Sequence, residues 1–344
     1  MLPTINMEST MNERILLSHG SGGKLSHDLI EKNLLSHLSN PLLAKLDDSA
    51  VFDLSGRLAF TTDSYVVNPI FFPGSDIGKL AVCGTVNDLA MSGATPLYLS
   101  LSLIIEEGLA LDELSKIVSS IKATADEAEI EIVTGDTKVV NHGSADKLFI
   151  NTSGIGAVSP GIDISGANAQ VGDKVILSGT IGDHGIAVMS QREGLKFSVP
   201  IQSDCAPLNK LVSQMLEASS QIHCLRDPTR GGLATTLNEF AGQSNVGIMI
   251  EEEKIPVHDG VRAACELLGF DPLYVANEGK LIAIVAPNDA ENILARMKQN
   301  VYGADACIIG KVTEEHKGRV IMKTRLGASR IVDMLSGELL PRIC

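Results

Sequence analysis

The stretch Thr85-Val86-Asn87-Asp88-Leu89-Ala90-Met91-Ser92-Gly93-Ala94-Thr95-Pro96 joins the end of a predicted helix to the start of a predicted strand. Ser75 or Asp76 can cap that helix, whose apolar residues recur at helical spacing until Gly93. Further elements are predicted downstream, namely a strand over 97–105, a helix over 111–128, a strand over 130–134 and a strand over 147–156. Strands and helices that alternate at these lengths predict an α/β domain.

Two apolar runs upstream of that helix, over 46–52 and 58–67, predict the arms of a β-hairpin with Gly56 in its turn. Asp48 and Asp63 occupy comparable points of the two arms, so we expect them to meet on one face.

The segment Leu17–Leu25 is rich in glycine and comes just before a helical pattern. Glycines let several N–H groups point the same way, and a helix start favours an anion, so the segment suits phosphate oxygens. Lys24 adds a cation there. A flexible glycine linker explains the composition equally well.

Four acids, Asp48, Asp63, Asp88 and Asp136, lie at predicted strand ends or on the helix, each flanked by small residues. Mg²⁺ in nucleotide sites is typically held by a few carboxylates together with substrate phosphates. Any one of these acids could be a cap or turn residue, but the four together predict a cation site. Lys138 could clamp a phosphate or carry a proton.

The second half begins after a glycine-rich linker at 160–173. Its predicted elements are a strand over 174–179, a helix after 180–185, a helix after 227–233 capped by Thr229 or Asp227, a helix over 257–268, a strand over 281–286, a helix over 289–299 and strands near 306–312 and 319–323. Glu278 sits in a glycine turn before an apolar strand, which is typical either of a functional loop carboxylate or of a solvated turn acid.

Composition excludes several classes of protein. The 344 residues carry a net charge of −14, which disfavours nucleic acid and an anionic membrane surface as partners. The six cysteines form no CxxC pair, so reduced thiols in a cytoplasmic protein fit best. No signal peptide and no apolar run long enough to span a membrane is recognisable.

The chain ends in Pro341-Arg342-Ile343-Cys344, after a run that reads as a partly mobile tail with at most one or two helical turns. A terminal thiol could carry an attached group on an arm into a pocket elsewhere. A chance cysteine at a frayed end is the simpler explanation of this stretch alone.

Eight motifs together supply a resemblance. They are HGSGGK (19–24), LDDSAVF (46–52), TTDSYVV (61–67), TVNDLAMSGATP (85–96), TGDTKVV (134–140), SGTIGDHG (178–185), DPTRGGL (227–233) and NEGKL (277–281). Their order resembles that of the aminoimidazole-ribotide (AIR) synthetase, or PurM-like, ATP-binding superfamily. With the terminal PRIC, residues 14–344 resemble its hydrogenase-maturation branch, the HypE family.

The resemblance implies a two-domain α/β fold and a homodimer whose N-terminal strands close a barrel at the interface. We accordingly expect a disordered leader over 1–13, a glycine-rich phosphate-binding segment over 14–45, an ATP-binding domain over 46–160, a C-terminal domain over 170–324 and a flexible tail over 325–344.

The resemblance also implies a function. HypE-like proteins accept a carbamoyl group on the terminal cysteine from HypF, dehydrate it with ATP to an S-cyanate, and pass the cyano group to iron on a HypC–HypD scaffold. The family positions then give residue roles. Cys344 is the carrier, and Lys138 and Glu278 match the positions assigned to the base; His19, Gly20, Gly22, Gly23 and Lys24 cradle ATP, and Asp48, Asp63, Asp88 and Asp136 bind ATP and Mg²⁺.

Two other classes of function stay open on these residues. One is another enzyme of the superfamily, such as a selenide kinase, a thiamine-phosphate kinase or a purine-pathway ligase. The glycine-rich segment lacks the reactive cysteine of a selenide kinase, and the other two need no terminal cysteine. The second class is a non-catalytic maturation scaffold.

Overall fold

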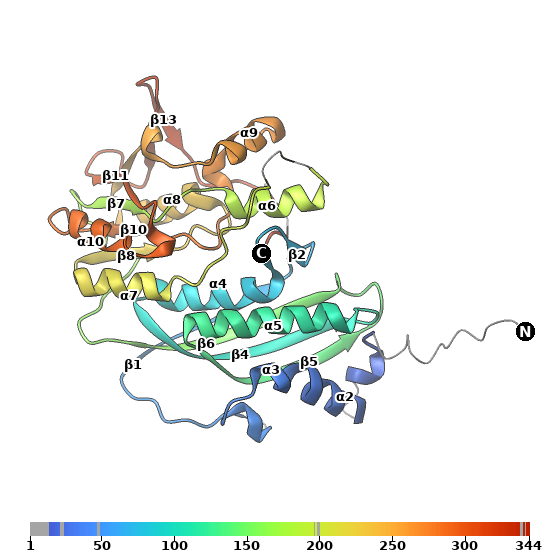
Figure 1. The fold of residues 1–344 in the computed structure, drawn as a ribbon. Helices are drawn as coiled ribbons and strands as arrows, with labels where there is room; N and C mark the ends of the chain where they lie inside the picture. Colours follow the sequence, from blue (N-terminus) through green and yellow to red (C-terminus); the bar gives the residue numbers. More distant parts are fainter. Residues whose placement is uncertain are drawn as a thin grey trace, which may run out of the picture.

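The computed structural model describes residues 14–20, 24–46, 49–195, 197, 200–337, 340 and 342–344. The expected leader over 1–13 and the predicted site residues Gly22, Gly23 and Asp48 lie outside these ranges. Within them the chain forms two sheet-containing halves, with helix α4 (Ile77–Met91) between them (Figure 1).

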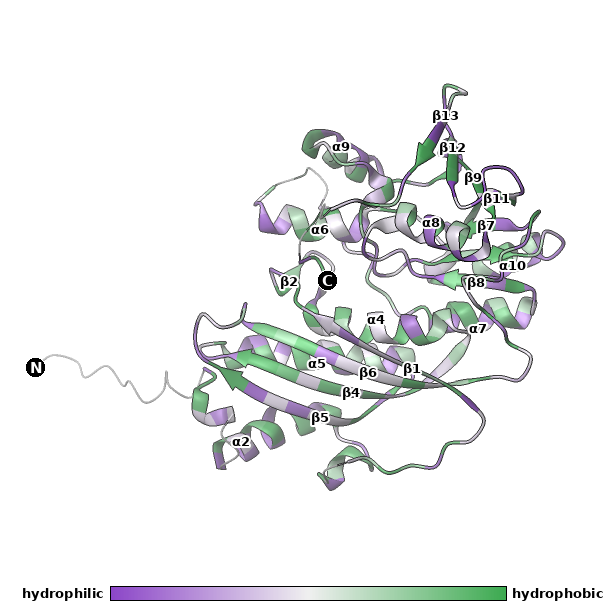
Figure 2. Ribbon diagram, turned by 180° about the vertical axis from the view of Figure 1, so that it is seen from behind, coloured by the Kyte–Doolittle hydropathy of each residue, from purple (hydrophilic) through white to green (hydrophobic). Residues whose placement is uncertain are grey.

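The first half is a four-stranded mixed sheet. Its strands follow the order β1 (Arg57–Tyr65), β6 (Leu148–Val158), β4 (Ala94–Glu106) and β5 (Glu131–Val140). Helices α4 and α5 (Leu111–Ala128) pack on one face. Residues that pair across strands share a face, and the face away from α4 and α5 carries both apolar and polar residues. Figure 2 shows bands of both kinds of residue along these strands. Phe60 on that open face is 71% exposed.

The second half is a seven-stranded sheet with helices around it. Its strands follow the order β13 (Ser329–Val332), β12 (Val320–Lys323), β9 (Gly247–Glu251), β11 (Cys307–Thr313), β7 (Lys174–Leu177), β10 (Ile282–Val285) and β8 (Ile222–Arg226). Its α-helices are α6 (Asp183–Arg192), α7 (Asn209–Ala218), α8 (Gly232–Ser244), α9 (Asp259–Leu268) and α10 (Ala290–Met297).

Short elements complete the structure. They are the helices α2 (Lys24–Leu29) and α3 (Ser36–Leu38), the strands β2 (Phe71–Phe72) and β3 (Ser75–Asp76), and the 3-10 or π turns η1 (Leu17–Gly20), η2 (Ile30–Leu35), η3 (Leu43–Lys45), η4 (Glu252–Lys254), η5 (Pro272–Tyr274) and η6 (Val301–Gly303). Among the described helices, none has both the length and the apolar character that a bilayer span requires.

Helix α4 is buried on nearly every side, because it packs on the first sheet below and on α7 and β8 above. A helix that is apolar all round is typical of such a position. The Asp76 side chain caps it by accepting from the backbone N–H groups of Gly78 and Lys79, at 2.7 and 3.1 Å, as predicted. The bounds of α5 are also confirmed.

The predicted hairpin over 46–67 is wrong in its first arm. Residues 49–56 form no strand, and β1 pairs with β6 instead. The Phe52 ring packs on Tyr98 of β4, with 4.4 Å between centroids, so this segment crosses the open face of the sheet. The packing of Phe52 on β4, which lies two strands in from β1, therefore outweighs the local preference for a hairpin.

Two other expectations also differ from the structure, and three longer elements have no counterpart in the predictions. Strand β5 continues to Val140, so Asp136 and Lys138 lie on a strand rather than in a loop, because its parallel partner β4 extends alongside. Helix α8 is preceded by Gly231 in the left-handed region (φ 78°), without a side-chain cap. Elements α7, β8 and β9 were not predicted.

The C-terminal segment is more ordered than expected. Its residues 329–332 form β13, which pairs antiparallel with β12. Its last residues are docked against the first half, where Val66 and Asn68 donate backbone N–H groups to the backbone oxygens of Cys344 and Arg342, both at 3.2 Å. Buried Ile343 (4% exposed) joins the core of that half, so apolar burial accompanies these bonds.

A candidate active site around Cys344

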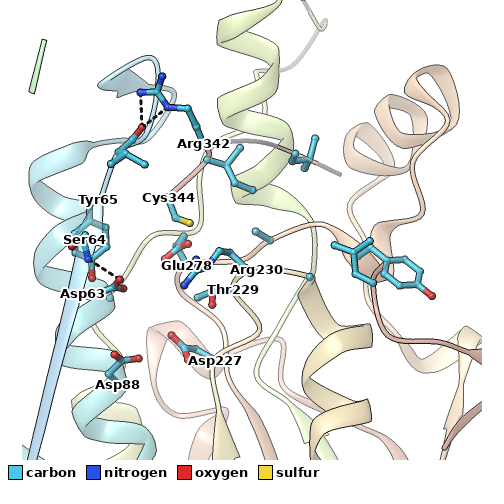
Figure 3. Close-up of a pocket in the computed structure, with 18 of the residues that line it drawn as sticks. Asp63, Ser64, Tyr65, Asp88, Asp227, Thr229, Arg230, Glu278, Arg342 and Cys344 are labelled. Carbon is cyan, nitrogen blue, oxygen red and sulfur yellow. Dashed lines mark hydrogen bonds between the residues drawn. The ribbon is translucent and has the colours of Figure 1, made fainter. Parts of the chain in front are cut away.

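A cavity of about 620 Å³ lies between the two halves, and the chain terminus forms part of its wall (Figure 3). The first half contributes Asp63 from β1 and Asp88 from α4, and the second half contributes Asp227, Arg230 and Glu278 from loops. Cys344 points into the space above Glu278. The cavity thus brings together a thiol, several carboxylates and a cation from five separate segments.

The terminal residues are held chiefly through their backbone. Pairing of 342 and 344 with 68 and 66 gives a short antiparallel ladder. The Arg342 guanidinium donates to the Val66 carbonyl at 3.0 Å, pairs with Asp146 and lies over the Phe149 ring at 5.9 Å. These contacts fix where the sulfur of Cys344 can lie.

The docked sulfur is in an environment that opposes ionisation. Burial, and next the nearby Glu278 carboxyl, raise the pKa of the Cys344 thiol to about 12. Arg230 acts in the opposite direction. At neutral pH the docked thiol is therefore protonated and a poor nucleophile, whereas a sulfur with a neutral attached group escapes this penalty.

Glu278 is the most confined carboxyl of the site, at 2% exposed. Its backbone N–H donates to the Asp204 carboxylate at 3.0 Å, and its carbonyl accepts from the Asn87 amide at 3.2 Å. Among the described residues no donor lies within hydrogen-bond distance of its Oε1. Burial, followed by Cys205 and then by neighbouring aspartates, raises the pKa of Glu278 well above its ordinary value. Such a carboxylate, once ionised, binds a proton strongly.

Three aspartates face one another deeper in the cavity. Burial, with a contribution from Asp63, raises the pKa of Asp88, although the Thr61 hydroxyl donates to it at 2.8 Å. Burial and then the charge of Asp88 raise the pKa of Asp227 to about 7. These carboxylates repel one another, so a cation between them would be stabilising.

Asp88 reaches this position because α4 lies unusually close to β1. A Cβ at Gly84 would be 2.2 Å from the Tyr65 hydroxyl oxygen. Nearby, the hydroxyls of Thr85 and Thr152 are 2.5 Å apart, so small side chains let the helix pack closely against β1 and β6. Gly84 is therefore required for the geometry of the site.

A second cavity, of about 300 Å³, lies beside the glycine-rich segment. Its polar wall includes His19, Gly20, Asp136 and Lys138, and leucines form most of the rest. Lys138 Nζ lies 2.8 Å from Asp136 Oδ2, and this contact lowers the pKa of the Asp136 carboxyl. A Cβ at Gly20 would be 2.7 Å from the Val139 backbone nitrogen, so this segment touches β5 directly.

Comparison with known proteins identifies the family. The model described as AIR synthase related protein, N-terminal domain, matches residues 46–158, and the corresponding C-terminal domain model matches 170–323. Carbamoyl dehydratase HypE of Bradyrhizobium diazoefficiens is 55% identical over 330 residues, which are 95% of each chain. The chain belongs to the HypE family of carbamoyl dehydratases.

Solved HypE structures agree with this assignment. A HypE crystal structure in complex with ATP has a TM-score of 0.93 and 51% identity, covering 96% of this chain and 99% of that one. A HypE–HypF complex has a TM-score of 0.79 and 51% identity, covering 89% and 99%. This HypE-family chain is thus a dehydratase of hydrogenase maturation, with the expected two-domain PurM-like fold.

The predicted site residues of this HypE-family enzyme divide into two groups. Asp63, Asp88, Glu278 and Cys344 line the larger cavity, whereas His19, Gly20, Asp136 and Lys138 line the smaller one. Lys24 begins α2 beside that smaller cavity and is not among its lining residues. The family resemblance instead implied that all of them serve one nucleotide site.

The sequence did not predict Asn87 and Asp204 as organisers of the site, and it predicted Asp227 only as a possible helix cap. The motif DPTRGGL did signal Asp227 and Arg230, because an acid and a base flank its helix start. Asn87 stands directly before Asp88, but nothing in the sequence indicates that its amide reaches the loop of Glu278.

Proposed function

We propose that this enzyme dehydrates a carbamoyl group on Cys344 to an S-cyanate, which supplies the cyanide ligands of the [NiFe]-hydrogenase iron. The observation that carries the proposal is the position of the Cys344 thiol beside the buried carboxyl of Glu278 in a cavity that also holds acids (Figure 3). A terminal thiol without a role would have no reason to be docked through consecutive backbone groups.

The chemistry needs a leaving group and a base. The carbamoyl oxygen attacks the γ-phosphorus of ATP, and one N–H proton is lost as ADP departs. Loss of the second N–H proton and of phosphate then leaves a C≡N group on sulfur. Glu278 is placed to accept a proton from that nitrogen, because it lines the cavity and its Oε1 has no hydrogen-bond partner among the described residues. A general base typically contributes about 10²–10⁴-fold.

ATP is the phosphoryl donor in this proposal. A HypE structure 51% identical to this chain is a complex with ATP. Here the glycine-rich segment and the Asp136–Lys138 pair form one polar wall with His19 and Gly20, which suits a polyphosphate next to the leucine-lined cavity. Gly22, Gly23 and Lys24 belong to the same proposed cradle.

Mg²⁺ fits the acids of the larger cavity. Within the described part of the chain, Asp63 and Asp88 form no salt bridge that would compete with a cation, and their mutual repulsion with Asp227 favours one. In the described ranges no three acidic, histidine or cysteine side chains converge at metal-ligand geometry. Mg²⁺ in nucleotide sites is typically held by one or two carboxylates plus substrate phosphates. When bound, Mg²⁺ would neutralise charge on the transferred phosphoryl group. Asp88→Ala should therefore abolish turnover. We keep Asp48 and Asp136 as candidate ligands.

A homodimer would complete the site. Strands β1 and β5 are opposite edges of the sheet, three strand spacings or roughly 14 Å apart. Asp63 pairs with Thr152 on the α4 side, whereas Asp136 pairs with Ser102 and Lys138 with Ile104 on the open side. One chain therefore does not bring Lys138 to its own Cys344. We propose that Lys138 and Asp136 of a second copy serve this cavity, with the open faces forming the interface.

The proposed partners follow from the same chemistry. A HypE–HypF complex has been solved, so we propose HypF as the carbamoyl donor and the HypC–HypD scaffold as the acceptor of the cyano group. Carbamoylation requires a reduced Cys344, which favours a reducing compartment such as the cytoplasm.

Mass spectrometry of the C-terminal peptide tests the proposal. After incubation with the carbamoyltransferase and carbamoyl phosphate, the peptide that ends in Cys344 should gain a carbamoyl group, and ATP should then remove one water from it. Cys344→Ala should receive nothing. A carbamoyl group that persists in the presence of ATP and Mg²⁺, or that resides on another cysteine, contradicts the proposal.

A further inference from the structure

His184 is a fully buried histidine in the first turn of α6, with 0% exposure. Its Nε2 lies 2.7 Å from the carbonyl oxygen of Ile343, and its Nδ1 lies 2.9 Å from Ser203 Oγ. A carbonyl oxygen can only accept, so Nε2 carries the proton and Nδ1 accepts from the serine hydroxyl. Burial lowers the pKa of His184, in agreement with this neutral form. The histidine therefore donates its single proton to the residue before Cys344.

The same histidine is connected to the loop that holds Glu278. Ser203 Oγ accepts from the backbone N–H of Cys205 at 3.2 Å, and Asp204 between them accepts from the Glu278 N–H at 3.0 Å. The Phe72 ring contacts the imidazole edge-on, with 5.4 Å between centroids. The imidazole is thus fixed on one side and presents Nε2–H to the tail on the other.

We propose that His184 is a positioning residue: its bond to the Ile343 carbonyl holds the docked tail so that the sulfur of Cys344 stays beside Glu278. Loss of this bond shifts the tail from the docked to a released arrangement. The inference rests on the proposed function and adds to it that the docked tail is dehydrated, whereas a released tail is loaded by the carbamoyltransferase.

Unlike its two neighbours in the tail, the Ile343 backbone oxygen accepts no hydrogen bond from residues 66 and 68. The backbone oxygens of Arg342 and Cys344 accept from the backbone N–H groups of Asn68 and Val66, whereas the carbonyl of Ile343 between them points the other way, toward α6. Without His184 it would be buried and unpaired in the docked tail but hydrated in the released one. The docking equilibrium should fall by about 5- to 150-fold, the usual effect of one buried polar group left unpaired.

Loss of the positioning role of His184 has an experimental signature that a general folding defect lacks. A weaker bond between His184 and the tail lowers the rate of dehydration, because fewer tails are docked, yet it leaves the rate of carbamoyl loading unchanged or raises it. A folding defect lowers both rates.

Alkylation of Cys344 with iodoacetamide, followed on the C-terminal peptide by mass spectrometry, measures release directly. His184→Phe removes both hydrogen bonds, and His184→Asn keeps a polar atom only near the Nδ1 position. Both should raise the alkylation rate of Cys344 by about 5- to 150-fold. His184→Gln places an amide nitrogen near the Nε2 position and should stay close to the wild type. His258→Asn is the matched control, because His258 bonds the adjacent Asp183 at 2.8 Å rather than the tail.

A wild-type alkylation rate in His184→Asn and His184→Phe overturns the proposal, and so does dehydration at the wild-type rate in both. If His184→Phe fails to fold, the comparison of His184→Asn with His184→Gln decides alone. If the alkylation rates change as expected but carbamoylated wild-type protein loses no water, the positioning role of His184 is supported and the proposed function fails.

Discussion

Asn87 offers a quantitative test of how α4 organises the site. This residue is fully buried and connects α4 to two loops of the second half. Its Nδ2 donates to the carbonyls of Ala206 and Glu278, at 3.1 and 3.2 Å, and its Oδ1 accepts from the Leu208 N–H at 2.8 Å. Asn87→Ala would leave two carbonyls and one N–H group unpaired in the interior.

Each buried group left unpaired costs about 1–3 kcal/mol, and losses that share one loop do not add fully. We therefore expect Asn87→Ala to lower the free energy of unfolding by about 3–5 kcal/mol, a large part of a typical 5–15 kcal/mol. Because the backbone of Glu278 also loses a partner, dehydration should fall more steeply than carbamoyl loading. Asn87→Asp, which retains only the bond from Leu208 and sets a carboxyl against two carbonyls, should be worse.

The assay is urea unfolding followed by far-UV circular dichroism, since the chain has no tryptophan. Asn238→Ala is the matched control, because the Asn238 amide donates to the carbonyls of Ala234 and Val332, both at 2.9 Å, away from the cavity. It should lose stability and keep its turnover. An Asn87→Ala protein that loses less than about 1 kcal/mol and dehydrates normally would refute the reasoning.

Three further predictions concern the chemistry. Glu278→Gln should still be carbamoylated but should dehydrate about 10²–10⁴-fold more slowly, as judged on the C-terminal peptide, and a rate within twofold of the wild type removes its role as base. Docking favours the thiol form of Cys344, whose pKa is raised from 9.0 to about 12, so the contribution of the thiol to docking is fully present below pH 9 and is lost as the pH rises toward 12. The alkylation rate should keep rising above pH 9, where a free thiol levels off, and a plateau near pH 9 would contradict this environment. Finally, a mixed dimer of one Lys138→Ala chain and one Cys344→Ala chain keeps one intact site if the site is shared, so it should show turnover although neither mutant homodimer does. A mixed dimer without turnover argues against a shared site.

Much of the fold could be predicted because local patterns encode it. The apolar spacing of α5 gives its bounds, and the Asp76 side chain marks the start of α4, since a cap and a helical period act within a few residues. The hairpin expected at 46–67 could not be judged in this way. Its first arm packs through Phe52 on β4, a partner some fifty residues away, which no local pattern indicates.

The sequence by itself determined the chemical groups of this protein: a thiol at the very end, a glycine-rich segment and acids beside small residues, in an order that identifies the family. Only the tertiary structure decided which of these groups meet. Strand order places Asp63 and Asp136 at opposite edges and faces of one sheet, whereas α4, lying close to β1, brings Asp88 to Asp63 and Asn87 to the loop of Glu278. Pairing between distant segments depends on packing across the whole core, so these neighbours are set by the fold rather than by any one stretch of sequence.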